Sequence, residues 1–305
     1  MDNKKPNLYW PIYQNLENEL LNITNYIKFE DKQLTVYSDM LLNLLFRISI
    51  EIESISKDLY LSNGGKNFEK ENEMFFDTTC LDFLENKWEL SKKVVRIVNS
   101  NMLFSEKFSK LTPLKKANKR GSSGSKWKKA YQAIKHNRAK NYELGNLENC
   151  INALAALFIL NIYYKDNEYY MNNSELNKFD TSQGSKIFAI DISIGKNFDG
   201  NLKKDSASTY FINYSDDFIK NFKESHIKTN LALVELLLKE KAIKENIESG
   251  KITLSDLVKP EKAIELVGID KFKKYYSKAK SKSDFNVILS NEKFHAYLNK
   301  EVIAD

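Results

Sequence analysis

The chain has 305 residues, of which 42% are hydrophobic and 29% charged, with only 10 Gly and 4 Pro. This composition is typical of a globular, helix-rich protein and excludes disorder over most of the chain. The formal net charge is +6, yet residues 107–142 contain twelve Lys and Arg and no Asp or Glu. The remaining 35 basic residues face 41 acidic ones, so the rest of the chain carries a charge of −6.

This basic segment, residues 107–142, fits a polyanionic partner such as RNA, DNA or a nucleotide, because phosphate charge supplies most of the nonspecific attraction. The alternative is a lysine-rich surface that only keeps the protein soluble. A second, smaller basic patch occurs at residues 271–282, which contain six Lys and no acid.

Cysteine content and hydropathy favour a soluble protein in a reducing compartment. Cys80 and Cys150 lie in apolar helical patterns and are expected to be buried, with no disulfide framework. The first residues contain no apolar signal region, and the longest apolar run, residues 151–164, is interrupted by Asn. We therefore expect a cytoplasmic protein with no membrane association.

The first two predicted helices lie within the first 60 residues. Leu16, Leu20 and Ile23 recur at helical spacing after Pro11, a residue suited to the start of a helix. Residues 34–59 have apolar side chains on more than one side, which indicates a central, buried helix.

The next predicted elements alternate between helix and strand. A third helix follows the predicted N-cap Asp77, and the β-branched residues 92–104 favour a short strand. Residues 125–142 are predicted to form one helix. Residues 146–164 are apolar nearly all round, which is typical of a core helix.

A polar, Asn-rich stretch after residue 165 marks the predicted domain boundary. Alternating apolar residues then predict two strands, at 186–194 and 208–214, joined by a loop into a small sheet. Helical patterns return from residue 215. The predicted fold class is mainly α: a helical domain over residues 1–165, then residues 166–305, with a small β-hairpin or sheet and additional C-terminal helices.

Arg138 is predicted to face the protein interior, because it lies on the apolar side of its helix. An unpaired interior charge is costly, so we expect an ion pair with Glu51 or Glu53 of the second helix. This pair serves either to fix how two helices cross or to hold a phosphate between them. The residues expected to support the site are Arg47, Glu51, Glu53, Trp127 and Tyr131.

His136 lies about half a turn from Arg138 and is the candidate general acid or base, because imidazole titrates near neutral pH. Lys135 and Arg138 are the candidates for stabilising charge on a phosphodiester under attack by a ribose 2′-OH. The alternative for His136 is an ordinary solvated residue. The cations expected to hold nucleic acid are Lys115, Lys116, Lys119, Arg120, Lys126, Lys128, Lys129 and Lys140.

Other chemistries are poorly matched by the sequence. GSSGSK, residues 121–126, lacks the GxxxxGK[ST] spacing of a phosphate-binding P-loop. Three His and two Cys far apart give no zinc pattern, and no GxSxG motif is present. We therefore expect no metal and no cofactor. The best-matched enzyme is a metal-independent ribonuclease that uses His, Arg and Lys.

Four stretches together resemble bacterial proteins related to the HEPN superfamily: LLFRISIEIESISKDLY, LTPLKKANKR, WKKAYQAIKHNR and NLENCINALAALFILNIYY. The resemblance covers roughly residues 10–165. It implies a HEPN-like helical bundle, frequently a homodimer. It also implies a link to abortive infection, toxin–antitoxin or other antiviral systems, in which many HEPN proteins are metal-independent ribonucleases. The catalytic signature, an Arg followed four to six residues later by His, is not matched, because AKNYEL follows Arg138 and ISIEIES follows Arg47.

Three functions remain as hypotheses. The first is a ribonuclease of a defence or toxin system, in which the basic segment binds RNA and His136 transfers the proton; a dimer would bring two His136 side chains to one groove. The second is a noncatalytic protein that binds nucleic acid or a nucleotide at the same segment. The third is a protein-interaction component whose lysines face an acidic partner of a defence system.

Overall fold

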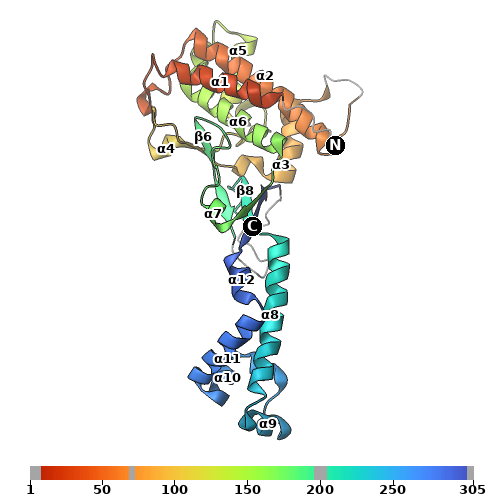
Figure 1. The fold of residues 1–305 in the computed structure, drawn as a ribbon. Coiled ribbons are helices and arrows are strands. Elements are labelled where there is room, and N and C mark those ends of the chain that lie inside the picture. The colour runs from red at the N-terminus through yellow and green to blue at the C-terminus, as the bar shows by residue number, and fades with distance from the viewer. Residues whose placement is uncertain (1–7, 69–72, 196–204, 301–305) are drawn as a thin grey trace.

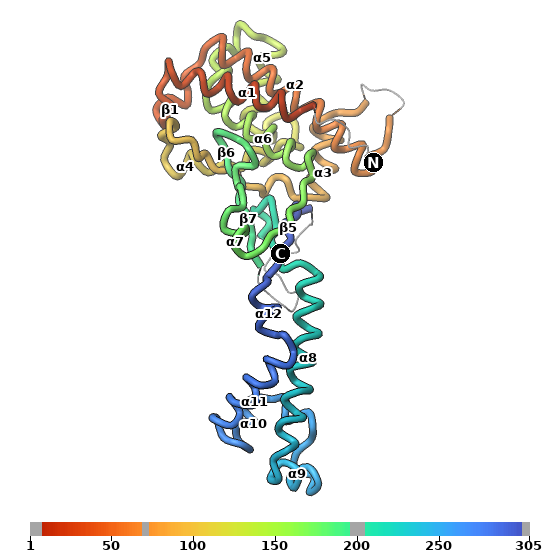
Figure 2. The backbone as a smooth tube through the Cα atoms, in the orientation of Figure 1, coloured from red at the N-terminus to blue at the C-terminus, as the bar shows by residue number. Residues whose placement is uncertain are grey.

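The computed structural model describes residues 8–68, 73–195 and 205–300. Figure 1 shows an elongated molecule: a helical body carries a neck of short strands, from which an arm of helices extends. Helix accounts for 59% of the structure and strand for 11%, so the predicted mainly-α class is confirmed. The trace in Figure 2 shows the long helix α8 (Asp216–Leu237) running down the arm from the neck.

Two long helices, α2 (Asp39–Ser62) and α6 (Leu147–Lys165), pack along each other at the centre of the body. The body also contains α1 (Tyr9–Ile23), α3 (Asp82–Trp88), α4 (Glu106–Ser109) and α5 (Lys126–His136). The short helix α7 (Asn173–Leu176) lies at the neck (Figure 1). A π-helical turn, η3 (Phe76–Leu81), precedes α3. Short 3-10 turns are η1 (Asp31–Gln33), η4 (Leu90–Lys92), η5 (Gly121–Ser123) and η6 (Tyr142–Leu144).

Helix α6 is apolar on nearly every side, and its side chains form much of the main hydrophobic core. It is long and apolar enough to cross a membrane, but 83% of its most apolar window is buried in the protein, as in the core helix of a soluble protein. Cys150 donates its thiol to the backbone carbonyl of Leu41 in α2 at 3.0 Å, and Cys80 is buried as well. The prediction of two buried cysteines is thus confirmed.

The strands form three small sheets among the described residues. The first pairs β1 (Phe29–Glu30) with β3 (Met102–Leu103) in parallel. The second is antiparallel, in the order β4 (Lys110–Leu111), β2 (Val95–Ile97), β6 (Phe188–Ile190). The third, at the neck, has the order β5 (Tyr169–Asn172), β9 (Lys293–Leu298), β8 (Tyr210–Tyr214), β7 (Ile192–Ile194).

The strands after residue 185 correct the predicted hairpin. The expected strand over 186–194 is divided, because β6 pairs with β2 of the body whereas β7 joins the neck sheet. β7 and β8 do pair, but they run parallel, which a tight hairpin cannot produce. Residues 196–204 of the connecting segment, including Gly200, lie outside the described residues.

The arm is an insertion between neighbouring strands. β8 and β9 are antiparallel, and Tyr214 is paired with Phe294 at their shared end. The chain between these strands forms α8 and the elements α9 (Lys241–Glu248), η7 (Leu254–Val258), α10 (Pro260–Val267), α11 (Ile269–Lys282) and α12 (Phe285–Ser290). A hydrophobic cluster separate from the main core lies within this arm, around Leu237 and Phe272.

The main core continues past the predicted boundary at residue 165. Phe188 and Tyr210 belong to the same buried cluster as α2 and α6. The predicted division into 1–165 and 166–305 therefore does not separate two cores. The physical reason is that β6 completes a sheet with β2, so the chain must return to the body before the arm begins.

A buried carboxylate fastens this returning chain to the first helix. Glu17 of α1 is 1% exposed, and its Oε1 accepts hydrogen bonds from the Tyr13 hydroxyl at 2.8 Å and from the Ser185 hydroxyl. The same oxygen accepts from the backbone amides of Lys186 and Ile187 at 3.1 and 3.2 Å. Four donors thus share this one acceptor: one comes from α1 and three come from residues 185–187, around the start of β6.

We expect Glu17→Ala to lower the free energy of unfolding by about 2–3 kcal/mol, because it leaves buried donors without an acceptor. Urea denaturation followed by circular dichroism measures this change. Glu19→Ala on the same helix is the control: Glu19 pairs with Arg47 at the surface, and its loss should change stability by less than about 1 kcal/mol. Equal effects of the two substitutions would contradict a special role for Glu17.

Candidate nucleic-acid interface

A pocket of about 880 Å³ lies at the basic segment, between α2, residues 74–77 at the start of η3, the 120–122 loop and α5. We call it the α2–α5 pocket. Its wall combines cationic and aromatic side chains with few acids. The lining residues are Glu53, Lys57, Met74, Phe75, Phe76, Asp77, Arg120, Gly121, Ser122, Lys128, Lys129, Gln132 and Lys135.

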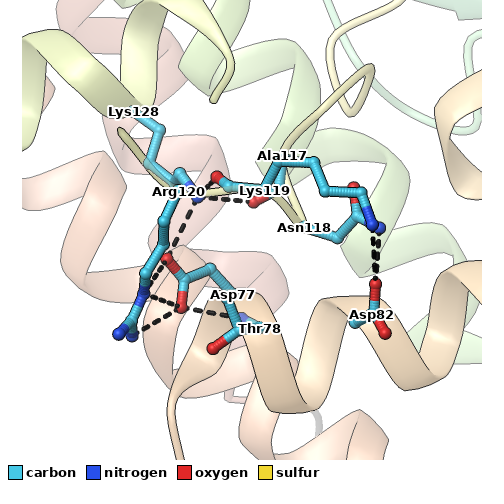
Figure 3. A network of polar contacts seen from close by, with 8 residues as sticks. All are labelled: Asp77, Thr78, Asp82, Ala117, Asn118, Lys119, Arg120 and Lys128. Carbon is cyan, nitrogen blue, oxygen red and sulfur yellow. Dashed lines mark hydrogen bonds and ion pairs between the residues drawn. The ribbon is translucent and has the colours of Figure 1, made fainter. Parts of the chain in front are cut away.

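One carboxylate organises the cationic wall of this pocket. The Asp77 side chain is only 5% exposed and accepts two-point hydrogen bonds from the Arg120 guanidinium, with Nε and Nη2 at 2.8–3.0 Å. Its other neighbour is the buried ammonium of Lys128, 3.1 Å away. Figure 3 shows both cations converging on Asp77 from the basic segment.

Burial alone would raise the pKa of the Asp77 carboxyl. Hydrogen bonds from Arg120, the Thr78 amide and Lys128 outweigh that effect, so the pKa of Asp77 is lowered below its ordinary value. Asp77 therefore stays ionised and holds both cations. The sequence suggested instead that Asp77 caps a helix, but the chain makes a π-helical turn from Phe76 and α3 begins only at Asp82.

The prediction that Lys128 binds nucleic acid is wrong, because Lys128 is a buried structural residue. Its side chain is 3% exposed, and its ammonium donates to Asp77 and to the backbone carbonyls of Ala117 and Lys119. All three ammonium donors have an acceptor. Burial lowers the pKa of Lys128, an effect that the hydrogen bond and charge of Asp77 oppose.

Two further cations of the predicted set are also paired with acids. Lys119 lies 3.3 Å from Asp82, which accepts a second hydrogen bond from Asn118 at 2.7 Å (Figure 3). Lys126, at the start of α5, pairs with Glu148 of α6. With Arg120 and Lys128, four of the eight expected binding cations are thus at least partly neutralised within the protein.

The other expected cations keep their charge available. In the described part of the chain, Lys115, Lys116, Lys129 and Lys140 have no ion pair with a carboxylate, and all are exposed. Lys129 lines the α2–α5 pocket, and its ammonium lies 3.3 Å from the Ser122 carbonyl oxygen. This subset, rather than the whole run, can contact a polyanion directly.

Arg138 corrects a second prediction, because it is not an interior residue. Helix α5 ends at His136, and the backbone of Asn137 is extended, with φ −152° and ψ 87°. The Asn141 side chain donates to the Ala133 and Asn137 carbonyls, which closes the helix end. The regular helix to residue 142 that would have turned Arg138 inward does not form.

The partner of Arg138 is Asp39 rather than Glu51 or Glu53. Its Nη2 lies 3.3 Å from Asp39 and 3.2 Å from the Asn43 side-chain oxygen, and the Arg138 side chain is 53% exposed. At about 1.5 Å per residue, the ten positions from Asn43 to Glu53 span about 15 Å of α2. Arg138 therefore lies well away from the α2–α5 pocket, which Glu53 lines.

The three candidate catalytic residues are not gathered at one point. Lys135 lines the pocket, with its ammonium 5.4 Å from the Tyr131 ring centre. His136, the next residue, is exposed at the end of α5 and is not part of the pocket wall. Arg138 is held beside the first turn of α2. Within one chain, no phosphate in the pocket would meet all three.

The predicted supporting residues have separate structural partners. Trp127 is buried and donates its indole N–H to the Pro113 carbonyl at 2.9 Å, which anchors α5. Burial, with the nearby charge of Glu53, raises the pKa of Tyr131 to about 12, and the Tyr131 hydroxyl donates to Glu53. These contacts fix one wall of the pocket.

The remaining pair lies on α2. Arg47 forms an exposed ion pair with Glu19 of α1 at 2.6 Å. Burial raises the pKa of Glu51, against the opposing charge of Arg47.

Sequence reasoning missed Phe75, Asp77 and Lys57 as members of the site. Phe75 and Asp77 lie in the short stretch MFFD, in which the sequence pattern predicts only a helix cap at Asp77. The available signal was an acid beside two aromatic residues, but its partner cations are more than 40 positions away in the sequence. That separation hides the pocket from any local pattern.

Comparison with family models, curated proteins and solved structures found no match for this chain. The resemblance to HEPN proteins therefore stays a prediction, and the helical architecture rests on the structure itself. Among residues 8–68, 73–195 and 205–300, no group of three or more His, Cys, Asp or Glu side chains is placed to hold a metal ion.

We expect Asp77→Asn to lower the free energy of unfolding by about 2–4 kcal/mol, because Lys128 then keeps a buried charge without its counter-ion. The stabilisation by Asp77 is complete above the ordinary carboxyl pKa of about 4 and is lost as the pH falls through the lower folded-state pKa. The stability difference between the native protein and the variant should therefore shrink in strong acid.

Urea denaturation at several pH values measures both effects. Asp82→Asn is the matched control, because Asp82 also anchors the basic segment but is 37% exposed; its change should be below about 1 kcal/mol. A stability difference for Asp77→Asn that does not depend on pH would contradict the argument.

Proposed function

We propose that this protein binds RNA through the α2–α5 pocket and the exposed lysines around it. The proposal rests on one observation: five cationic and two acidic side chains line a single pocket, a formal lining charge of +3. Lysines that only maintain solubility need not converge on a concave site. A cationic pocket with low-polarity walls concentrates field lines, which favours an anionic ligand.

The charges that remain after internal pairing strengthen this argument. Asp77 is already occupied by Arg120 and Lys128. The ammonium groups of Lys57, Lys129 and Lys135 have no carboxylate partner among the described residues. Phosphate oxygens would supply the missing counter-charge.

Binding without chemistry is the form of the proposal that the geometry favours. The ribonuclease hypothesis needs His136 at the bound phosphodiester with Arg138 or Lys135 beside it, but only Lys135 of these three residues lines the pocket. General acid–base catalysis requires hydrogen-bond reach to the reacting atoms. Ribonuclease activity thus remains a separate prediction, which a second copy of the chain would have to complete with its own His136.

The resemblance to HEPN proteins supports a role for this binding activity in a bacterial antiviral or toxin–antitoxin system. Recognition of RNA in the cytoplasm is the step of such a system that the α2–α5 pocket could perform. An acidic partner protein remains the alternative ligand of the same lysines. Purification from the host organism would separate the two, because bound RNA raises the ratio of absorbance at 260 nm to that at 280 nm.

We expect a fluorescently labelled single-stranded RNA to bind with a strong salt dependence, because bound lysines release counter-ions from the phosphates. In Lys129→Gln/Lys135→Gln, the slope of log K against log salt should fall by about one unit for each phosphate that the variant no longer binds. Fluorescence anisotropy at several salt concentrations gives both slopes. Lys128 is unsuitable for this test because it is buried.

Lys241→Gln/Lys244→Gln is the control for this measurement. These lysines lie in α9, at the far end of the arm in Figure 1, and the variant removes the same charge. Its slope should equal that of the native protein. An equal decrease in both double variants, or a slope near zero in the native protein, would reject the proposal.

We expect RNA to remain intact when it is incubated with the purified protein in EDTA, because the proposed catalytic residues do not share a site. Denaturing gel electrophoresis over several hours measures this. Cleavage by the native protein that disappears in His136→Ala would restore the ribonuclease hypothesis. The variant is a safe one, since His136 is exposed at a helix end.

A further inference from the structure

One wall of the α2–α5 pocket pairs a guanidinium group with an aromatic ring, an arrangement that attraction of a phosphate does not require. The Arg120 guanidinium carbon lies 4.2 Å from the centre of the Phe75 ring, so the cation covers the aromatic face. Phe75 is 46% exposed, and the Arg120 side chain is 50% exposed. A planar cation thus lies over the face of a half-exposed ring in the wall of a charged pocket.

Asp77 holds the Arg120 side of this cation–aromatic pair in place. Asp77 binds Nε and Nη2 of Arg120, which fixes the plane of the guanidinium, and the hydrogen bonds raise the pKa of Arg120 further. No hydrogen bond joins Nη1 to a residue that the structure describes. The group therefore presents a fixed flat surface and a free donor edge, which is the preorganisation that a planar ligand needs.

Phosphate-binding groups face the same space. Lys129 and Lys135 line the pocket from α5, and Lys57 lines it from α2. Met74 and Phe76 add apolar surface to the pocket lining. The volume of about 880 Å³ falls within the range of roughly 300–1,000 Å³ that is usual for small-molecule sites.

A ligand that fits all of these walls has a flat, weakly polar part and an anionic part. We infer that the α2–α5 pocket receives a single nucleotide of the bound RNA, with its base stacked on the Arg120–Phe75 pair and its phosphate held by Lys129 and Lys135. Aromatic rings and guanidinium planes are the two surfaces on which proteins stack unpaired bases. This inference rests on the proposed RNA-binding function and assigns a subsite within it.

The base is what separates this inference from simple attraction of phosphate. We expect AMP to bind at least about tenfold more tightly than ribose 5-phosphate, because only AMP can stack. Isothermal titration calorimetry on the full chain measures both. AMP should also displace labelled RNA in a competition assay, and polyglutamate should do so only at much higher concentration.

Two variants separate stacking from charge. Phe75→Leu keeps an apolar side chain but removes the ring, so it should weaken AMP by about fivefold to tenfold and leave ribose 5-phosphate unchanged. Lys135→Gln should weaken both ligands. Tyr276→Leu is the control, since Tyr276 lies under Lys280 at 4.7 Å on the arm and forms a comparable cation–aromatic pair far from the pocket.

The outcomes distinguish this inference from the proposed function. If RNA binds with a steep salt dependence but AMP and ribose 5-phosphate bind equally, the nucleotide subsite is wrong and RNA binding stands. If AMP binds through Phe75 but RNA does not bind, the site serves a free nucleotide and both proposals as stated fail. Stronger competition by polyglutamate than by AMP would overturn the inference in favour of an acidic protein partner.

Discussion

The position of the basic segment depends on the buried Asp77 carboxylate. Two cations of opposite exposure meet there: Lys128 is enclosed, whereas Arg120 remains half exposed above Phe75. Because a buried ammonium without a counter-ion is strongly destabilising, the loop and α5 have to return to the turn that carries Asp77. The hydrogen bond of Trp127, which anchors α5, and the second anchor at Asp82 hold other parts of the basic segment. In this region, the charged side chains of Asp77, Lys128 and Arg120 first hold the basic segment in place, and only the remaining charge is available for binding.

Long-range ion pairs of this kind explain which parts of the fold and of the pocket could be predicted from the sequence. The long apolar helices could be predicted, α2 from its wide apolar surface and α6 from being apolar nearly all round, because burial dominates their energetics. The end of α5 could not, since it is decided by Asn137 and by the Asn141 side chain that caps two carbonyls. Two residues beyond that end, Arg138 left the interior and paired with Asp39. A helical wheel has no information about where a helix stops.

The sequence also does not show which lysines are buried and which are exposed. Lys128 and Lys129 are adjacent and chemically identical, yet one is enclosed and the other exposed. Lys128 is distinguished by its contacts with Asp77, 51 positions earlier in the chain, and with the Ala117 and Lys119 carbonyls. The same is true of the sheets: the residues of β6 and β7 form one alternating pattern in the sequence, but Asp191 separates them into strands of different sheets, and its carboxylate pairs with Arg96. Long-range pairing, not local propensity, sets these outcomes.

The way in which the arm joins the neck has a consequence for how the chain can vary. The arm leaves at Ser215 and returns at Lys293, and the Ser215 amide donates to the Lys293 carbonyl at 2.8 Å. The arm is therefore one continuous insertion in the neck sheet, and one backbone hydrogen bond joins its two ends. Such a module has its own hydrophobic cluster and does not alter the register of β8 and β9. It can therefore lengthen, shorten or change its surface while the body and its pocket keep their geometry.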